Sequence, residues 1–160
     1  MNKLIGSNLV FDEAMYLAAI AHNGSVDLGG APYILHPIRV AASLLVVWPY
    51  DYELAAIGLL HDVVEDTNMT FEDLEKIGFS PRVVDALRAL THKKGVPYDA
   101  YIDDLIATKN WSAIAVKLAD LKDNANLSRL GNNVGAADIK RTEKYIRAIA
   151  KIEALDIVDM

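Results

Sequence analysis

The sequence predicts an all-α bundle of about seven to eight helices. Apolar residues recur at helical spacing along most of the 160 residues, and helix-start and helix-stop signals separate these periodic segments. No alternation of apolar and polar residues is long enough to predict a strand, and neither a repeat nor a linker interrupts the pattern. We therefore expect one compact helical domain over residues 1–160.

Local signals support the helices in chain order. Asn8 and Asp51 are N-cap candidates, and Thr70-x-x-Asp73 resembles a capping box. Ser80-Pro81 places a capping Ser before a Pro at the first helical position. The helix that Asp51 opens is expected to continue through His61-Asp62. The expected helices cover residues 11–22, 33–47, 51–67, 71–77, 81–90, 98–108, 111–127 and 136–157.

Composition is that of an ordinary globular chain, with 52% hydrophobic and 24% charged residues. The absence of cysteine excludes disulfides and thiolate metal sites, and it fits a reducing, cytoplasmic location. The sequence shows no signal-peptide pattern and no apolar run long enough to span a bilayer, so no membrane partner is expected.

Charge is distributed unevenly around the net value of −6. Residues 1–75 hold eleven acidic and two basic residues, whereas residues 76–160 hold eleven acidic and fourteen basic ones. The acidic first half could therefore bind a cation, and the basic second half could bind an anion. An uneven surface charge can also arise without any functional role. The net negative charge argues against an extended nucleic-acid-binding surface. Whether the chain forms a homo-oligomer is not determined by the sequence.

The stretch His61-Asp62-Val63-Val64-Glu65-Asp66-Thr67 directly follows the apolar run Leu54–Leu60. Several ionisable groups after a buried run are costly unless something organises their charge, and a bound cation does so. His36 and Asp120, each flanked by apolar residues, would complete a His₂Asp₂ set from two other helices. Such N and O donors suit one divalent ion such as Mn²⁺, Fe²⁺ or Zn²⁺.

Each of these residues also has an ordinary structural explanation. His36 alone would be a hydrogen-bonded core histidine, and Asp120 alone would be an ion-pair partner of Lys117. The order and local context of the four together favour a metal site.

Three motifs of this chain resemble the hydrolase domain of the RelA/SpoT family, a helical member of the HD phosphohydrolase superfamily. They are Tyr33-Ile34-Leu35-His36-Pro37, the block from His61 to Thr67, and Lys117-Leu118-Ala119-Asp120 with Asn124. The resemblance spans about His22 to Tyr145 and includes no synthetase or regulatory domain. It therefore implies a small alarmone hydrolase with the HD-domain type of helical bundle.

The resemblance implies Mn²⁺-dependent removal of the 3′-pyrophosphate from guanosine tetra- and pentaphosphate. It makes His36, His61, Asp62 and Asp120 the metal ligands. It makes Glu65 and Asp66 a catalytic acidic pair that orients water and moves its proton. By the same resemblance, Asn124 and the pair Arg141-x-x-x-Tyr145 contact the nucleotide. Other candidates to neutralise phosphate charge are Lys117, Lys122 and His92-Lys93-Lys94.

The chain departs from the family at two places that concern the base. Family members carry an Arg before the Tyr-Ile-x-His-Pro motif, whereas this chain has Asp27 near that position, in a glycine-rich loop. After Asp120 the family pattern Arg-x-His-Asn becomes Leu121-Lys122-Asp123-Asn124. A carboxylate accepts hydrogen bonds where Arg donates them, so Asp27 is a candidate base contact that would alter base selectivity.

Two alternatives remain at this stage. Another HD phosphohydrolase, such as a nucleoside monophosphate phosphatase, would share the metal residues. A metal-stabilised module that senses a nucleotide without hydrolysing it would share them too. The Glu65-Asp66-Thr67 extension favours the alarmone hydrolase, and Asp27 weakens that interpretation.

Overall fold

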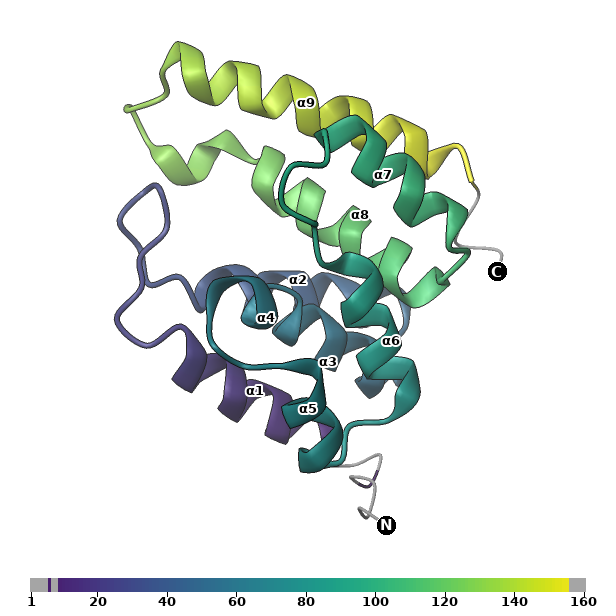
Figure 1. Cartoon of the computed structure of the whole chain (residues 1–160). Helices are drawn as coiled ribbons and strands as arrows, with labels where there is room; N and C mark the ends of the chain where they lie inside the picture. Colours follow the sequence, from purple (N-terminus) through teal and green to yellow (C-terminus); the bar gives the residue numbers. More distant parts are fainter. Residues whose placement is uncertain (1–5, 7–8, 156–160) are drawn as a thin grey trace.

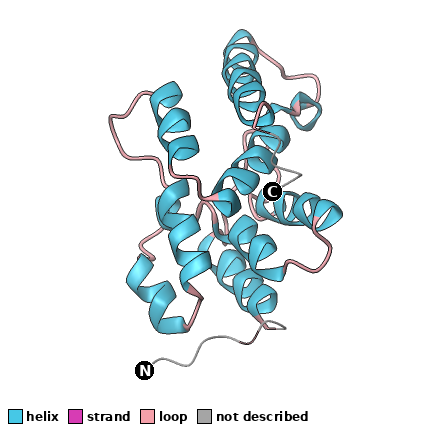
Figure 2. Cartoon of the chain, turned by 90° about the vertical axis from the view of Figure 1, so that its right-hand side faces the viewer, coloured by secondary structure: helices cyan, strands magenta, loops and turns pink. Residues whose placement is uncertain are grey.

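The structure is a computed structural model that describes residue 6 and residues 9–155. Within this part of the chain it contains helices joined by loops and no strand, which confirms the all-α class (Figures 1 and 2). Eight α-helices have seven residues or more, as expected, and a short ninth one is α4. The helices are α1 (Val10–Ala21), α2 (Leu35–Val47), α3 (Tyr52–Leu60), α4 (Val63–Asp66), α5 (Phe71–Ile77), α6 (Pro81–Leu90), α7 (Tyr98–Ala107), α8 (Trp111–Ala125), the 3₁₀ helix η1 (Leu127–Leu130) and α9 (Ala136–Glu153).

Three of the predicted helix starts are confirmed by hydrogen bonds. The Asp51 carboxylate accepts the amide of Leu54 at the start of α3. Thr70 and Asp73 form the reciprocal capping box of α5. The Ser80 side chain accepts from an amide in the first turn of α6. The predicted cap Asn8 lies outside the described residues, and Leu9 occupies the N-cap position of α1.

The prediction of an unbroken helix through His61-Asp62 is wrong. α3 ends at Leu60, and α4 begins at Val63. The carbonyl of Gly58 would accept the amide of Asp62 in a continuous α-helix, but it lies 2.7 Å from Nδ1 of His61 and accepts that N–H. The side chain of His61 therefore competes with the helix backbone at the position where the site is built.

Other helix boundaries differ by a few residues. α2 begins at Leu35 rather than Tyr33, and α8 ends at Ala125. Asn126 then caps the separate 3₁₀ helix through its bond from the Ser128 amide. The predicted end of the last helix, Ile157, lies outside the described residues, and α9 is assigned to Glu153.

Buried apolar side chains from most of the helices form one core, with α3 at its centre. Every residue from Leu54 to Leu60 is buried, because α1, α2, α6 and α8 all pack against this helix. α8 and α9 lie together in the other part of the molecule, with α7 alongside them (Figure 1). No helix in the described residues is long and apolar enough to cross a membrane.

Candidate metal centre and cleft

Four side chains that can bind a metal meet where α2, the α3–α4 junction and α8 come together. Nε2 of His36 lies 3.2 Å from Nε2 of His61 and 3.1 Å from Oδ1 of Asp120. Nε2 of His61 lies 3.1 Å from Oδ2 of Asp62. His36, His61 and Asp120 are buried. The structure thus brings together all four residues that the sequence predicted as a His₂Asp₂ set.

The protonation of the two histidines fits a bound cation. Nδ1 of His36 lies 2.6 Å from a carboxylate oxygen of Asp123, and Nδ1 of His61 lies 2.7 Å from the Gly58 carbonyl. Both partners are acceptors, so each neutral ring carries its proton on Nδ1 and turns a lone pair on Nε2 toward the other. Two opposed lone pairs beside two carboxylates form a donor set suited to a divalent cation.

A proton competes with a cation at this cluster. Burial of His61 disfavours its charged form, but the carboxylates of Asp62 and Asp120 outweigh burial and raise its pKa well above the ordinary value. Lys117 and the two histidines likewise hold the pKa of Asp120 low against the effect of its burial. The two carboxylates therefore attract positive charge, which protons on the histidines or a bound cation can supply.

Asp123 is a residue that the sequence interpretation treated only as a departure from the family pattern. Its carboxylate holds His36 and also accepts two bonds from Arg39, from Nε at 2.7 Å and from Nη2 at 3.0 Å. Burial alone would raise its pKa, but these bonds hold the pKa far below the ordinary value. The i,i+3 spacing of Asp120 and Asp123 was the available signal, because it puts both carboxylates on one face of α8.

The two aspartates of the cluster are also held by hydrogen bonds. Lys117 donates to Oδ2 of Asp120 at 2.9 Å, and the amide of Asn124 donates to Oδ1 at 2.5 Å. The hydroxyl of Tyr33 donates to Oδ2 of Asp62 at 2.5 Å. Such partners fix the orientation of ligand side chains, so the cluster is preorganised.

Glu65 and Asp66 lie one turn beyond Asp62 and have different surroundings. Glu65 lines a hollow together with His61, Asp62 and Lys117, and it accepts the backbone amide of His92 at 2.7 Å. Burial, followed by the nearby charge of Asp62, raises the pKa of both Glu65 and Asp66. Asp66 does not line this hollow, so of the two acids Glu65 is the one that faces it.

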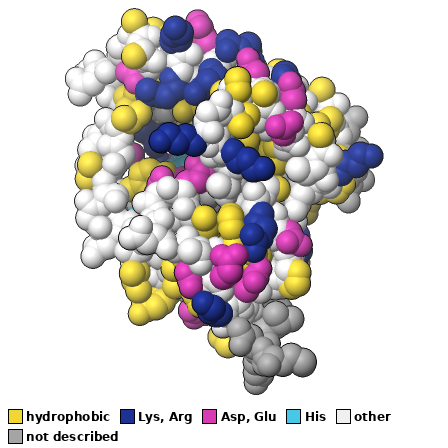
Figure 3. All heavy atoms as spheres, in the orientation of Figure 1, with side chains coloured by type: hydrophobic (Ala, Val, Ile, Leu, Met, Phe, Trp, Pro, Cys, Tyr) yellow, Lys and Arg dark blue, Asp and Glu magenta, His cyan; other side chains and the backbone are white. Residues whose placement is uncertain are grey.

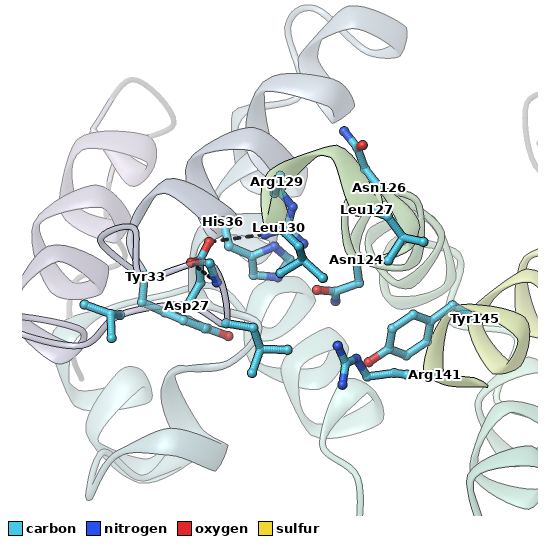
Figure 4. Close-up of a pocket in the computed structure, with 13 residues that line it drawn as sticks. Asp27, Tyr33, His36, Asn124, Asn126, Leu127, Arg129, Leu130, Arg141 and Tyr145 are labelled. Carbon is cyan, nitrogen blue, oxygen red and sulfur yellow. Dashed lines mark hydrogen bonds and ion pairs between the residues drawn. The ribbon is translucent and has the colours of Figure 1, made fainter. Parts of the chain in front are cut away.

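A cleft of two adjoining hollows, each of about 300 Å³, passes over the cluster. Tyr33, Asn124 and Tyr145 line both hollows, so the two lie side by side. The first, which we call the loop hollow, lies between the α1–α2 loop and the η1–α9 region (Figure 4). The second, the lysine hollow, contains Glu65 and Lys117. The space-filling view shows a recess with Lys and Arg side chains along its edge and acidic groups inside (Figure 3).

The predicted nucleotide contacts lie along this cleft. Arg141 and Tyr145, one turn apart on α9, line the loop hollow, where they face Asn124 (Figure 4). Arg141 forms a close ion pair with Asp138. Lys117 is largely buried beside Tyr101 and Tyr98, and the Asp120 charge outweighs burial and raises its pKa. These basic and aromatic groups come from the second half of the chain, and the prediction that this half meets an anion stays a prediction.

Other predicted phosphate contacts are not brought to the cluster. Lys122 is exposed and pairs with Glu153 at 2.7 Å. Lys93 lines a separate pocket beside α6 and α7. His92 does line the lysine hollow, but its Nε2 is bonded to the carbonyl of Val96 and its ring stacks on Tyr101.

Asp27 lies in the wall of the loop hollow but already has protein partners. One carboxylate oxygen accepts the amides of Gly29 and Ala31 at 2.9 and 3.0 Å, which closes the α1–α2 loop. The other oxygen pairs with Arg129 at 3.4 Å (Figure 4). Arg129 also donates to the carbonyl of Asp123 at 3.1 Å. Asp27 thus has a structural role that the sequence did not indicate, and its role toward a base stays a prediction.

Comparisons with known proteins show which family this chain is similar to. The family model of the HD domain matches residues 14–123. The guanosine-3′,5′-bis(diphosphate) 3′-pyrophosphohydrolase MESH1 of Drosophila melanogaster is 31% identical over 152 residues, which cover 91% of this chain and 84% of that protein. The bifunctional (p)ppGpp synthase/hydrolase SpoT of Escherichia coli is 40% identical over 83 residues, but these are 48% of this chain and 12% of that protein. A solved structure described as a metazoan ortholog of SpoT that hydrolyzes ppGpp superposes with a TM-score of 0.72 at 28% identity, over 89% of this chain and 84% of that one.

Proposed function

Because this chain belongs to the HD domain family, we propose that it is a metal-dependent phosphohydrolase that removes the 3′-pyrophosphate from a (p)ppGpp-like alarmone. The observation that carries the proposal is one cleft in which the His₂Asp₂ cluster, an acidic side chain of raised pKa and a buried lysine lie together. The relatives named for this activity give the substrate class. We propose that residues 1–160 act as one domain, since the buried residues form one core.

His36, His61, Asp62 and Asp120 would hold one divalent ion, for which Mn²⁺ is our first choice. When bound, such an ion supplies a water of lowered pKa and neutralises phosphate charge. Asp123, Asn124, Lys117 and Tyr33 hold the ligands in position through the hydrogen bonds described above. These hydrogen bonds would therefore set the orientation and the protonation state of the four ligand side chains.

Glu65 is the group that we propose for orienting water and accepting its proton. It lines the lysine hollow, and its raised pKa places it closer to neutral pH than an ordinary glutamate. The amide of His92 holds one oxygen, which leaves the other for water. Asp66, whose pKa is raised as well, is the second member of this acid–base pair, and it would share the proton transfer with Glu65.

The substrate would lie across the cluster along the cleft. The loop hollow has apolar walls from residues such as Leu28 and Leu130 and suits a base, with Asn124 and Tyr145 between it and the cluster. Lys117 and Arg141 would neutralise phosphate charge. Phosphate oxygens only accept hydrogen bonds, so cationic donors on both sides of the cluster favour a substrate with several phosphates.

The proposal is tested with a panel of nucleotides and the Mn²⁺-loaded protein. Guanosine and adenosine 3′-pyrophosphates are compared with nucleoside 5′-monophosphates, and the released pyrophosphate and phosphate are measured separately. We expect pyrophosphate from the 3′-pyrophosphorylated nucleotides. Phosphate release from monophosphates alone would identify a nucleotide phosphatase instead. If the nucleotides bind but are not hydrolysed in the presence of any of several divalent metals, the chain is a sensing module instead.

A further inference from the structure

Lys144 is a cation beside the lysine hollow, although it is not one of the residues that line it. Its Nζ lies 4.3 Å from the centroid of the Tyr98 ring and 5.1 Å from that of Tyr145, and both tyrosines line the hollow. Among the described residues, Lys144 forms no ion pair within 4.0 Å. Partial burial first, and then the positive charges of Lys117 and Arg141, lower its pKa. Lys117 and Arg141 are paired with Asp120 and Asp138, whereas Asp99, the acid whose charge acts on Lys144, forms no ion pair with it, so the charge of Lys144 is available to a ligand.

Tyr98 provides a second, independent observation. Its hydroxyl is buried and has no hydrogen-bond partner in the structure. A buried hydroxyl without a partner is destabilising, and such groups in native proteins usually serve a ligand or a water. Tyr98 lines the lysine hollow together with Lys117 and Glu65, so its unpartnered hydroxyl lies close to the cleft over the metal cluster.

The ligand that fits these groups is a phosphate rather than a base. Lysine ammonium groups lie over the Tyr98 ring, at 4.3 Å for Lys144 and 5.9 Å for Lys117, so this ring is occupied by cations rather than open to a stacked base. An ammonium and a hydroxyl both donate to phosphate oxygens. The loop hollow, across the cluster, has the apolar walls that a base needs.

We propose that Lys144 and the Tyr98 hydroxyl form a subsite for the terminal phosphate of the pyrophosphate group whose inner phosphate lies at the metal cluster. This inference rests on the proposed function, because it assigns the direction in which the substrate lies in the cleft. The base occupies the loop hollow, and the pyrophosphate extends past Lys117 toward Tyr98 and Lys144. The subsite distinguishes a pyrophosphate from a single phosphate, since a single phosphate does not reach it.

The test is calorimetric titration of the Mn²⁺-loaded protein with inorganic pyrophosphate and, separately, inorganic phosphate, at equal Mn²⁺ in cell and syringe. Lys144→Gln keeps the stem over Tyr98 and removes the charge, and we expect about tenfold weaker pyrophosphate binding. Tyr98→Phe keeps the ring and removes the hydroxyl, and we expect about fivefold weaker binding. Phosphate affinity should stay within about twofold in both variants, because a single phosphate does not touch the two groups.

Two controls make the outcome specific. Lys109→Gln removes an exposed positive charge just before the start of α8, away from the cleft, and should leave pyrophosphate binding unchanged. Tyr98→Phe should raise the melting temperature of the ligand-free protein, because it removes an unpartnered buried hydroxyl. Wild-type pyrophosphate affinity in both site variants would overturn the subsite, and so would an equal loss of phosphate affinity. This titration measures binding of pyrophosphate and involves no hydrolysis of a nucleotide. Its outcome is therefore independent of the nucleotide panel, which tests the proposed reaction.

Discussion

The carboxylate of Asp123 lies beside the metal cluster and determines how His36 presents its lone pair. It accepts the Nδ1 proton of His36 and is itself held by Arg39 and Arg129. A histidine whose second nitrogen is fixed in this way keeps one tautomer and one ring orientation. We therefore expect the affinity of the cluster for an ion to depend on a residue that need not touch the ion.

We predict that Asp123→Asn lowers the affinity for Mn²⁺ by about 10- to 100-fold, since loss of such a partner typically costs that much. Calorimetric titration with Mn²⁺ measures the effect. Asp103→Asn is the matched control, because Asp103 is an exposed carboxylate that pairs with Lys151 on another helix. Equal affinities in wild type and Asp123→Asn would show that His36 is oriented by packing alone.

The acidic pair gives a second prediction at this scale. Glu65→Gln and Asp66→Asn should keep the metal, because neither belongs to the four-ligand set, and should each lose about 10²- to 10⁴-fold in kcat. Metal content and turnover are measured on the same preparations. Wild-type turnover in both variants would remove the pair from the mechanism.

Asp27 can be tested by separating its two roles. Asp27→Asn keeps an oxygen acceptor for the amides of Gly29 and Ala31, whereas Asp27→Ala opens the loop. If Asp27 acts only through the loop, we expect Asp27→Ala to raise KM several-fold and Asp27→Asn to change it little. A change in the guanine-to-adenine ratio of kcat/KM in Asp27→Asn would instead identify the carboxylate as a base contact.

Among the helices, the start of α3 depends on a single carboxylate. Asp51 accepts the Leu54 amide and receives two bonds from Arg82, at 2.8 and 2.6 Å. Burial would raise its pKa, but these bonds outweigh burial and lower the pKa below the ordinary value. α3 leads directly to His61, so this cap supports the helix that carries the site.

A group whose pKa is lowered by folding stabilises the protein above its unfolded pKa, and the contribution is lost as the pH falls through the lower folded pKa. We therefore expect the stability that Asp51 provides to be complete above about pH 5 and to be lost progressively as the pH falls from there through the lower folded pKa. Asp51→Ala should cost about 1–2 kcal/mol at pH 7, the usual value of an N-cap. Urea unfolding of both proteins between pH 7 and pH 3 should show the difference shrinking with acid. A constant difference would contradict this account.

These helices also show what could be predicted from sequence. Caps such as Thr70 and Ser80 act within one turn, so their sequence signals were sufficient. The break at His61 depends on a side chain that takes the carbonyl of Gly58, which periodicity does not reveal. The Asp123–His36 and Asp27–Arg129 pairs join residues far apart in the chain, and one sequence holds no information on such contacts. The candidate ligands could be named from the sequence because the chemistry of His and Asp is visible in the residues themselves, and their role as ligands stays a prediction.

For the molecule as a whole, the cluster connects elements from both halves of the chain. α2 and the α3–α4 junction supply His36, His61 and Asp62, and α8 supplies Asp120. Without a cation the two carboxylates repel each other in a partly desolvated place, where protons, Lys117 and the neutral donors Tyr33 and Asn124 compensate them. A cation that binds the folded chain and not the unfolded one stabilises the fold by mass action.

We predict that one divalent ion binds per chain and that chelation destabilises the protein. At a free metal concentration of about 100 times Kd the stabilisation is about 2.7 kcal/mol. For a chain of this size, about 2–4 °C per kcal/mol gives a fall in melting temperature of roughly 5–10 °C on chelation. Thermal melts with and without chelator, together with elemental analysis, measure both quantities. Asp120→Asn should melt at the same temperature in both conditions, because its site is impaired already. An unchanged wild-type midpoint, with no metal in the protein, would rule out the site.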